Sequence, residues 1–285
     1  MTKEEIRSKL IQTKKWQKGT QRAPHKPLLL LIYLARLSNG QTGPLAFSQV
    51  EEKLKDLLQE FGPSRKSYHP EEPFARLSND GIWVLDKAVN TKGSVSISEL
   101  REVNPAGQLI PEIQDQLLKD RSLLNEAIQL LLEDNFPESI HEEIKSAIGL
   151  QEYFQLVKKA TRDPKFREEV LKAYEYSCAV CGFNLRIKNA IAGVEAAHIR
   201  WHAMNGPDTI SNGIALCTMH HKLFDLGAMG INVNRQLTVS PQTNGAGKEL
   251  WLNRFEGKPI RPPQKHYKLP SDDFLTWHEK EVFKW

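Results

Sequence analysis

Residues 178–225 read CAVCGFNLRIKNAIAGVEAAHIRWHAMNGPDTISNGIALCTMHHKLFD, and the organisation of the second half of the chain follows from this stretch. A Cys-x2-Cys pair opens it, and a Cys-x2-His pair follows 36 residues later. Thiolates and imidazoles are the ligands that zinc prefers, and four protein ligands leave no open position on the ion. The spacing therefore predicts a structural zinc site with four ligands: Cys178, Cys181, Cys217 and His220. The alternative is a cluster of buried free cysteines beside a surface histidine.

Between the two pairs, the hydrophobic pattern predicts two short strands followed by a helix. Residues 194–199 form an apolar run suited to a strand, and residues 214–216 form a second one after an Asn-Gly turn. A helix then starts near residue 220. Three polar side chains of chemically useful type lie in this small unit: His198, Asn212 and His221.

Composition places the chain among ordinary globular proteins. Hydrophobic residues make up 40% and charged residues 26% of the 285 residues, which is enough apolar material for a core in each half. The three cysteines all lie in the central stretch and no signal peptide is recognisable, which argues against a secreted disulfide protein. No run approaches about 18 uninterrupted apolar residues. We therefore expect a soluble protein of a reducing cytoplasm, without a membrane segment.

Positive charge is unevenly distributed, although the formal net charge is only +4. Residues 1–36 hold nine Lys or Arg against two Glu, and residues 151–285 hold 19 basic against 14 acidic side chains. Residues 111–152 are acidic instead, with ten acidic and three basic side chains. Two basic regions separated by an acidic helical one suit a protein that touches a polyanion at two places. Solvated helix faces would give the same totals, so charge alone does not identify the partner.

The first half reads as a mainly helical domain with a small amount of sheet. Helical spacing of apolar residues predicts helices over residues 4–16, 28–37, 47–61, 98–103 and 113–148, the last broken at Phe136-Pro137. Residues 82–85 read as a strand. Residues 64–74 are rich in proline, aromatic and basic residues, and we expect a polar loop that either faces a ligand or is a plain surface loop. The boundary is placed near residue 150, which gives domains at 1–150 and 151–285.

The three polar residues of the central stretch have a distinctive spacing. Asn212 follows His198 by 14 residues, His221 follows Asn212 by nine, and their contexts are VEAAHI, NGIALC and HHKLFD. This pattern resembles HNH endonucleases with the ββα-metal fold and covers about residues 150–285. The resemblance implies that His198 is the general base for the attacking water and that Asn212 orients the His198 loop. It implies that His221 binds a catalytic divalent ion, Mg²⁺ or Mn²⁺.

One position departs from that pattern. Many HNH enzymes carry an acidic metal ligand just before the base histidine, where this chain has Ala197. Glu195 lies two residues back and therefore on the same face of the expected strand. We expect Glu195 to supply the missing carboxylate to the catalytic ion. The alternative is an exposed glutamate without that role.

Two segments of the first half also carry a recognisable pattern. They read RAPHKPLLLL at residues 22–31 and HPEEPFARLSNDGIW at residues 69–83. They look like the sulfur-binding domain of phosphorothioated-DNA-dependent restriction endonucleases, over about residues 1–150. That family recognises DNA in which sulfur replaces one non-bridging phosphate oxygen. The resemblance implies a set of DNA-binding residues: Arg22, His25, Lys26, Pro73 and Arg76.

The chemistry of sulfur gives this expectation a physical reason. Sulfur is larger and softer than oxygen and accepts hydrogen bonds more weakly, so a small apolar cup beside basic groups should prefer it. Pro73 would line such a cup, with His25 and Lys26 beside the neighbouring phosphates. The family often has an aromatic residue before that proline. This chain has Glu72 there, which would place a negative charge near a phosphate.

Together these patterns predict an α+β protein in which a mainly helical DNA-recognition domain with a small sheet precedes a zinc-stabilised HNH domain. The leading hypothesis is a type IV restriction endonuclease that binds phosphorothioate-modified double-stranded DNA and cuts nearby phosphodiester bonds. One alternative is an HNH endonuclease directed to a modified base such as methylcytosine. Another is a zinc-stabilised DNA-binding module without catalysis. The oligomeric state stays open, with a homodimer as one option.

Overall fold

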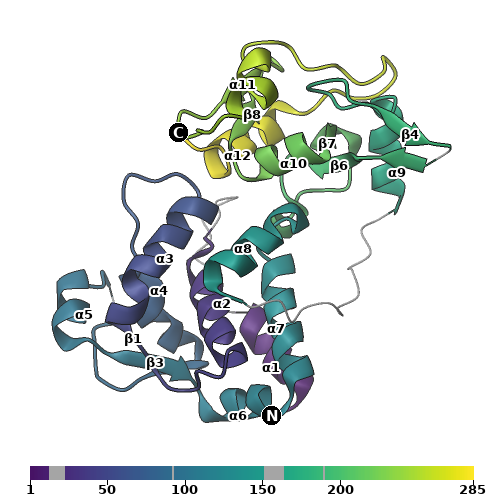
Figure 1. The fold of residues 1–285 in the computed structure, drawn as a ribbon. Coiled ribbons are helices and arrows are strands. Elements are labelled where there is room, and N and C mark those ends of the chain that lie inside the picture. The colour runs from purple at the N-terminus through teal and green to yellow at the C-terminus, as the bar shows by residue number, and fades with distance from the viewer. Residues whose placement is uncertain (13–22, 92, 151–163, 189) are drawn as a thin grey trace. The chain divides into compact units, whose positions relative to one another are not determined.

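The computed structural model describes residues 1–12, 23–91, 93–150, 164–188 and 190–285. The chain divides into two compact units, Met1–Lys158 and Lys159–Trp285, each with its own core (Figure 1). The expected boundary near residue 150 adjoins residues 151–163, which lie outside the described part, so the limits 1–150 and 151–285 remain a proposal. Within the described ranges, no helix is both long and apolar enough to cross a membrane.

An apolar helix forms the centre of the first unit. This helix, α2, spans His25–Ser38, and every residue from Pro27 to Ala35 is buried. Four helices pack directly against it: α3 (Phe47–Phe61), α4 (Glu71–Arg76), α7 (Arg121–Glu133) and α8 (His141–Ile148). The short α1 (Lys3–Ile11) packs against α7. Because its neighbours surround α2, a helix that is hydrophobic on every side is stable there (Figure 1).

A small antiparallel sheet completes the first unit. Its strand order is β1-β3-β2, with β1 at Leu45–Ala46, β2 at Trp83–Leu85 and β3 at Ala106–Leu109. Helices α5 (Ile97–Val103) and α6 (Pro111–Lys119) flank β3 in the sequence. The first unit is therefore mainly helical with a small sheet, which confirms the expected fold class.

The loop expected over residues 64–74 is wrong for its last residues, because a helix begins at Glu71. Residues Glu71–Arg76 form a short helix, α4, followed by the 3-10 turn η1 at Leu77–Asp80. Phe74 is fully buried in this helix, with its ring 5.2 Å from that of Phe47 and 6.0 Å from that of Trp83. Burial of one aromatic ring by distant elements stabilises a turn of helix that the proline-rich sequence does not suggest.

The expected helix over residues 113–148 is interrupted once more than the sequence suggested. α6 ends at Lys119 and α7 begins at Arg121, with Asp120 between them. The Asp120 carboxylate accepts hydrogen bonds from the backbone N–H groups of Ser122 and Leu123, at 3.0 and 3.1 Å. These bonds make Asp120 the N-cap of α7, and its extended backbone ends the preceding helix. The first expected helix, over residues 4–16, ends at Ile11, and residues 13–16 lie outside the described part.

The second unit contains the predicted order of strand, loop, strand and helix. These elements are β6 (Val194–His198), β7 (Gly213–Cys217) and α10 (Thr218–Asp225). Helix α9 (Pro164–Ala173) packs against both strands. The C-terminal part adds four elements: β8 (Met229–Ile231), β9 (Leu237–Val239), α11 (Lys248–Trp251) and α12 (Asp272–Glu281). Short 3-10 turns cover His202–Met204, Ile210–Asn212 and Asn253–Phe255.

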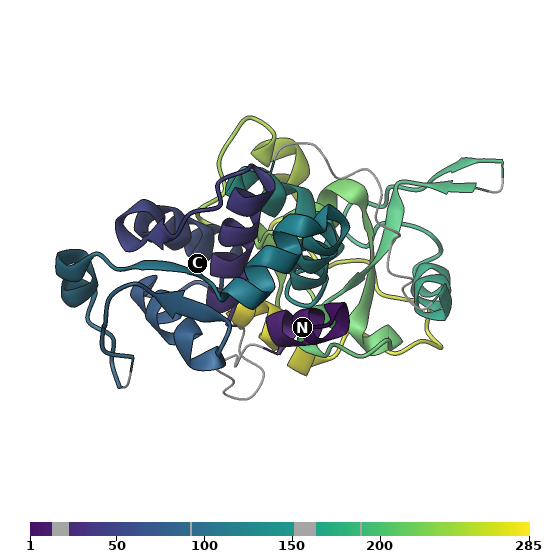
Figure 2. The ribbon, with the colours of Figure 1, turned by 90° about the horizontal axis from the view of Figure 1, so that it is seen from below.

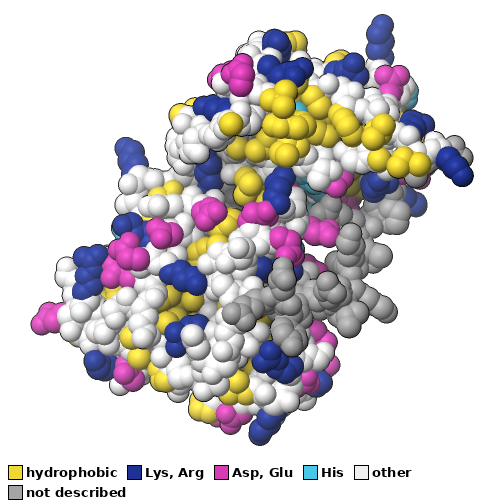
Figure 3. Space-filling view, viewed as in Figure 1, with side chains coloured by type: hydrophobic (Ala, Val, Ile, Leu, Met, Phe, Trp, Pro, Cys, Tyr) yellow, Lys and Arg dark blue, Asp and Glu magenta, His cyan; other side chains and the backbone are white. Residues whose placement is uncertain are grey.

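A two-stranded hairpin extends from the second unit. It consists of β4 (Leu185–Ile187) and β5 (Ala190–Ala192), and Figure 2 shows it projecting from the body of the unit. Apolar atoms gather over one face of this unit in Figure 3. The exposed large hydrophobic residues of the hairpin, α10 and α11 are Leu185, Ile187, Met219 and Leu250.

We predict that Phe74→Ala destabilises the first unit by about 3–5 kcal/mol, the usual cost of removing a buried ring. Native-state hydrogen exchange of the full chain, read at the amides of α2 and α3, measures this loss. Val84→Ala is the matched control, because Val84 lies on β2 but is 39% exposed. Equal protection in the Phe74 variant and the control would contradict a stabilising role for this ring.

Candidate functional site

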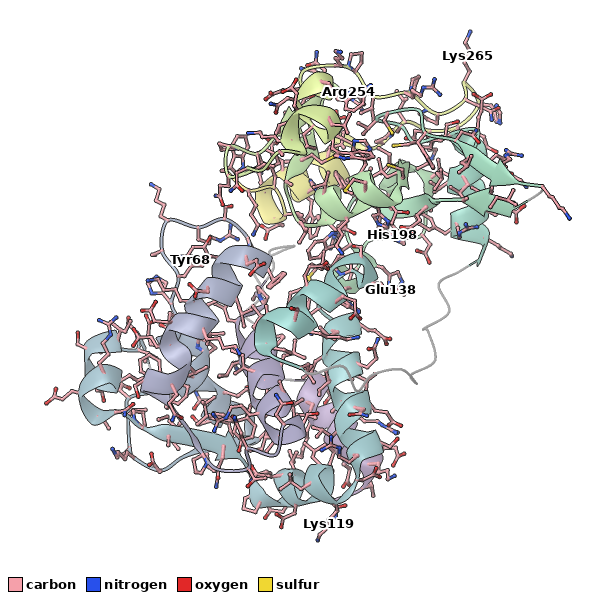
Figure 4. All side chains as sticks on the ribbon, viewed as in Figure 1. Tyr68, Lys119, Glu138, His198, Arg254 and Lys265 are labelled. Carbon is pink, nitrogen blue, oxygen red and sulfur yellow. The ribbon has the colours of Figure 1, made fainter. Side chains whose placement is uncertain are left out.

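The pairing of β6 with β7 separates two clusters of polar residues. The strands are antiparallel, with Val194 opposite Cys217 and His198 opposite Gly213. Cys217 and His198 therefore lie at opposite ends of the pair, about 13 Å apart at roughly 3.3 Å per residue. Figure 4 labels His198 in the second unit.

The structure brings together the four predicted zinc ligands. The sulfur atoms of Cys178, Cys181 and Cys217 and a ring nitrogen of His220 all lie within 4.8 Å of one another. His220 Nδ1 is 3.1 Å from the Cys217 sulfur and 3.6 Å from the Cys178 sulfur. Zn–S bonds of about 2.3 Å and Zn–N bonds of about 2.0 Å place tetrahedral ligands roughly 3.3–3.8 Å apart. This cluster therefore has the size and the chemistry of a zinc site.

Hydrogen bonds outside the cluster orient its ligands. His220 Nε2 lies 2.9 Å from the Trp251 carbonyl oxygen, so a proton on Nε2 donated to that oxygen leaves Nδ1 to face the sulfur atoms. The Ala179 N–H donates to the Ala215 carbonyl at 2.8 Å and fixes the first cysteine pair to β7. The cluster thus joins residues 178–181 to the end of β7 and the start of α10.

Protons are shared unevenly within the cluster. Hydrogen bonds from Cys181 and Cys217 lower the pKa of the Cys178 thiol, whereas contact with Cys178 raises the pKa of Cys217. Burial lowers the pKa of His220, but hydrogen bonds with Cys178 and Cys181 outweigh it and raise the pKa to about 9. A metal ion that binds these groups must displace the shared protons.

The predicted base, His198, lies at the end of β6 between an aromatic ring and a carboxylate. The Phe166 ring of α9 stacks on the imidazole, with ring centres 4.0 Å apart and planes 15° apart. His198 Nε2 is 2.7 Å from Asp208 Oδ1. The side chain of His198 is 9% exposed and that of Asp208 is 30% exposed, so the pair lies at the surface of the unit.

Asn212 is fully buried below this loop, where its amide group makes three hydrogen bonds. Its side-chain oxygen accepts from the Arg200 N–H at 2.8 Å. Its side-chain nitrogen donates to the carbonyl oxygens of Arg200 and Pro207, each at 3.0 Å. Asn212 therefore ties together both ends of the loop that follows His198.

His221 projects from α10 toward β6 and meets Glu195. The distance from His221 Nδ1 to Glu195 Oε2 is 2.7 Å, so the carboxylate two residues before Ala197 reaches the predicted metal ligand. The side chain of Glu195 is 45% exposed, whereas that of His221 is 5% exposed. An exposed carboxylate oxygen of Glu195 therefore lies beside a buried imidazole nitrogen of His221.

A second carboxylate supports His221 from within α10. Asp225 Oδ2 is 3.2 Å from His221 Nε2, and Asp225 Oδ1 accepts a hydrogen bond from Trp201 Nε1 at 3.0 Å. Burial lowers the pKa of His221, but the charges of Asp225 and Glu195 outweigh it and raise the pKa to about 9. The imidazole is therefore held between two carboxylates.

Sequence reasoning placed Glu195 with His221 on one ion but missed the other partners of the two histidines. Asp225 could have been identified from the sequence, because it follows His221 by four residues and residues four apart on a helix share a face. Asp208 and Trp201 have no such spacing, since the loop between β6 and β7 is irregular. The contact of Phe166 with His198 follows only from the packing of α9 against β6.

The predicted DNA-binding cations of the first unit have nearby carboxylates. Lys26 Nζ is 2.6 Å from Asp80 Oδ2, and both side chains are largely buried. Arg76 forms an ion pair with Glu72 and donates to the Gly93 carbonyl. Glu72 also accepts from the Val95 N–H, at 3.4 Å. Glu72 therefore connects α4 to the loop before α5.

His25 and Pro73 lie at the starts of two helices that pack together, α2 and α4. Burial, together with the charges of Arg65 and His69, lowers the pKa of His25 to about 4. The influence of Arg65 and His69 shows that the segment before α4 lies near His25. Pro73 is buried. Arg22, the remaining predicted DNA-binding residue, lies outside the described residues.

The loop before α4 carries further polar residues that sequence reasoning did not select. His69 is 2.9 Å from Glu71 Oε1 through Nδ1 and 2.8 Å from Ser67 Oγ through Nε2. The Arg65 N–H donates to the Tyr68 hydroxyl at 3.3 Å, and Figure 4 labels Tyr68 on this loop. The richness of this loop in proline, aromatic and basic residues was the sequence feature that could have pointed to them.

We predict that Cys217→Ala releases the bound metal and lowers the melting temperature of the second unit, because the cluster joins separate segments of it. Metal analysis of the purified full chain and thermal unfolding measure the two effects. Met219→Ala is the control on the same helix, since Met219 is 43% exposed. A Cys217 variant that retains zinc and melts like the control would contradict the assignment.

Comparisons with known proteins match both units. The family model described as ScoMcrA-like, DNA sulfur-binding domain, matches residues 3–153, and the HNH endonuclease model matches residues 178–232. A search of curated proteins finds no match.

The solved structures that the chain matches include two sulfur-binding domains complexed with phosphorothioated DNA. That of SprMcrA has 21% identity and a TM-score of 0.45, covering 53% of this chain and 95% of its own. That of ScoMcrA has 16% identity and a TM-score of 0.43, covering 50% and 94%. The modification-dependent TagI restriction endonuclease has 24% identity and a TM-score of 0.34, covering 47% and 41%.

The family model for the first unit spans more than half of the 285 residues. The HNH model spans the zinc-type cluster together with His198, Asn212 and His221. The chain therefore belongs to the family with a ScoMcrA-like DNA sulfur-binding domain and carries an HNH endonuclease domain after it.

Proposed function

We propose that this protein is a modification-dependent restriction endonuclease. Its first unit recognises double-stranded DNA with phosphorothioate linkages, and its second unit hydrolyses nearby phosphodiester bonds. One observation carries the proposal. A single chain joins a DNA sulfur-binding domain to an HNH domain in which Glu195 contacts His221 and Asp208 contacts His198.

His198 is the proposed general base for the attacking water. Phe166 and Asp208 hold its ring, and Asn212 holds the loop behind it. A positioned base accelerates such a step by about 10²–10⁴-fold. The small exposed fraction of the imidazole lets a water molecule reach it while the rest of the ring stays fixed.

Glu195 and His221 are the proposed ligands of a catalytic Mg²⁺ or Mn²⁺ ion. The Glu195 carboxylate is of the ligand type that these ions prefer, and its 2.7 Å contact with His221 places an imidazole nitrogen beside it. When bound, the cation would neutralise charge that develops on the scissile phosphate. Asp225 holds the opposite side of the His221 ring, as carboxylates commonly do behind metal-binding histidines. Because the pKa of His221 is about 9, the cation must displace a proton from it.

The proposal assigns a structural zinc ion to the Cys178 cluster, and it places the protein in the cytoplasm. Free thiols at a metal cluster persist in a reducing compartment, which supports both assignments. A homodimer is one option for the assembly on DNA.

For recognition, we propose that uncharged side chains distinguish sulfur from oxygen. His25 is neutral near pH 7, because burial and neighbouring cations lower its pKa to about 4, and Pro73 is buried. The charges of Lys26 and Arg76 are offset by Asp80 and Glu72. A phosphate oxygen loses more hydration than sulfur does when it enters such a weakly polar site. Exposed cations such as Lys66 then contribute attraction to the backbone that does not depend on sulfur.

We predict that His198→Ala abolishes cutting while DNA affinity stays largely intact, because a general base acts only in the reaction. Cleavage and binding of matched phosphorothioate and plain duplexes, with Mg²⁺ and with Mn²⁺, measure the two properties. His266→Ala is the control, since His266 is an exposed histidine of the same unit. Cutting by the His198 variant at the wild-type rate would exclude it as the base.

We predict that Pro73→Ser removes the preference for phosphorothioate DNA, whereas Lys66→Ala weakens binding to both duplexes by a similar factor. One small buried apolar contact is worth about 1–3 kcal/mol, or roughly 5- to 150-fold in affinity. The Lys66 change should also reduce the salt dependence of binding by about one unit of slope. Lys26→Ala is a poor test, because it leaves the buried Asp80 carboxylate without its cation.

Competition binding at fixed salt, with duplexes that differ by one sulfur atom, measures the preference directly. A wild-type protein without such a preference would contradict sulfur recognition and favour a modified base, which methylated duplexes in the same assay would reveal. A preference that survives in the Pro73 variant would place the sulfur contact elsewhere in the unit.

A further inference from the structure

Asp208 is an acidic residue that contacts the proposed base, and it is not one of the three residues of the HNH pattern. Its Oδ1 lies 2.7 Å from His198 Nε2, a distance typical of a charge-assisted hydrogen bond. It follows His198 by ten residues, across an irregular loop. The contact therefore depends on how that loop folds back on the end of β6.

The fold of the loop requires a glycine two residues before Asp208. A Cβ atom on Gly206 would lie 1.8 Å from the Arg200 carbonyl oxygen and 2.9 Å from Asn212 Nδ2. The Gly206 N–H donates to the Trp201 carbonyl at 3.0 Å. The two sides of the loop thus approach more closely than any other residue would allow.

Asn212 fixes the same loop from below. Its amide donates to the Pro207 carbonyl, directly before Asp208, and to the Arg200 carbonyl, two residues after His198. One buried side chain therefore sets the position of Asp208 relative to His198. In this chain, the asparagine of the HNH pattern therefore holds in place the segments that carry His198 and Asp208.

Two aromatic contacts restrict the imidazole without choosing its tautomer. Phe166 stacks on one face of the ring, and the His202 ring centre lies 5.8 Å away at a 60° tilt. An aromatic face limits rotation but does not select which nitrogen carries the proton. A carboxylate does select, because it only accepts hydrogen bonds when ionised.

We propose that Asp208 is a positioning residue for His198. Its carboxylate keeps a proton on Nε2, so that Nδ1 carries the lone pair that removes a proton from water. In that step the O–H bond of water breaks and an Nδ1–H bond forms. The electron pair stays on the oxygen that attacks phosphorus. The resulting imidazolium is then stabilised by the adjacent negative charge of Asp208.

This inference rests on the proposed role of His198 as the base, and the test separates the two. In the zinc-loaded two-domain protein, Asp208→Asn should lower the cleavage rate at least roughly 10-fold, the lower end of the cost of removing a carboxylate that orients a metal-binding histidine. DNA affinity and zinc content should not change. The acid limb of the pH–rate profile should move to lower pH, because a neutral amide no longer favours the protonated imidazole.

Nitrogen NMR of the ring gives a readout that does not depend on activity. The wild type should show His198 protonated on Nε2, and Asp208→Asn should raise the population protonated on Nδ1. Asp208→Glu should recover part of the rate and of the wild-type tautomer. Asp273→Asn removes the same charge at an exposed position of α12 and serves as the control.

The outcomes are distinguishable. If His198→Ala still cuts, the proposed base is wrong. If His198→Ala is inactive but Asp208→Asn cuts at the wild-type rate, only the role of Asp208 is overturned. A slower Asp208→Asn with an unchanged pH profile and an unchanged tautomer would also overturn it, because the loss would then be structural.

Discussion

The antiparallel pairing of β6 with β7 is the constraint on which the second unit depends. Its register places Cys217, a member of the proposed zinc cluster, at one end and His198 at the other. A shift by one residue would move Glu195 to the opposite face, away from His221. Gly213, the partner of His198, matters as well. A Cβ there would lie 2.3 Å from a Val170 methyl, so glycine lets α9 approach closely enough for Phe166 to stack on the imidazole.

Charge compensation governs both candidate sites. His221 lies between Glu195 and Asp225, and Lys26 is paired with Asp80. Buried or partly buried ions need such partners, because desolvation without a counter-charge is expensive. The number of basic residues near a site therefore overstates the positive charge that a phosphate would meet. This is why the proposed discrimination between sulfur and oxygen falls on uncharged groups rather than on Lys26.

Local patterns predicted the elements well where an apolar face was long. The helix expected over residues 47–61 has those bounds in the structure, and the strand expected from Val194 is β6. Prediction failed where one side chain, rather than a repeated pattern, decided the outcome. Burial of Phe74 makes a helix of an expected loop, and the capping bonds of Asp120 divide an expected helix into two.

The sequence by itself determined the fold class, the order of elements in the second unit, the four residues of the Cys178 cluster and the positions of His198, Asn212 and His221. The cluster residues and the three HNH residues are close together in the sequence, so the short chain segments between them allow few relative positions. Only the tertiary structure decided that Asp208, Asp225 and Phe166 meet the two histidines and that Asp80 meets Lys26. Most of these contacts join segments whose separation follows no helical or strand period, so packing alone brings them together.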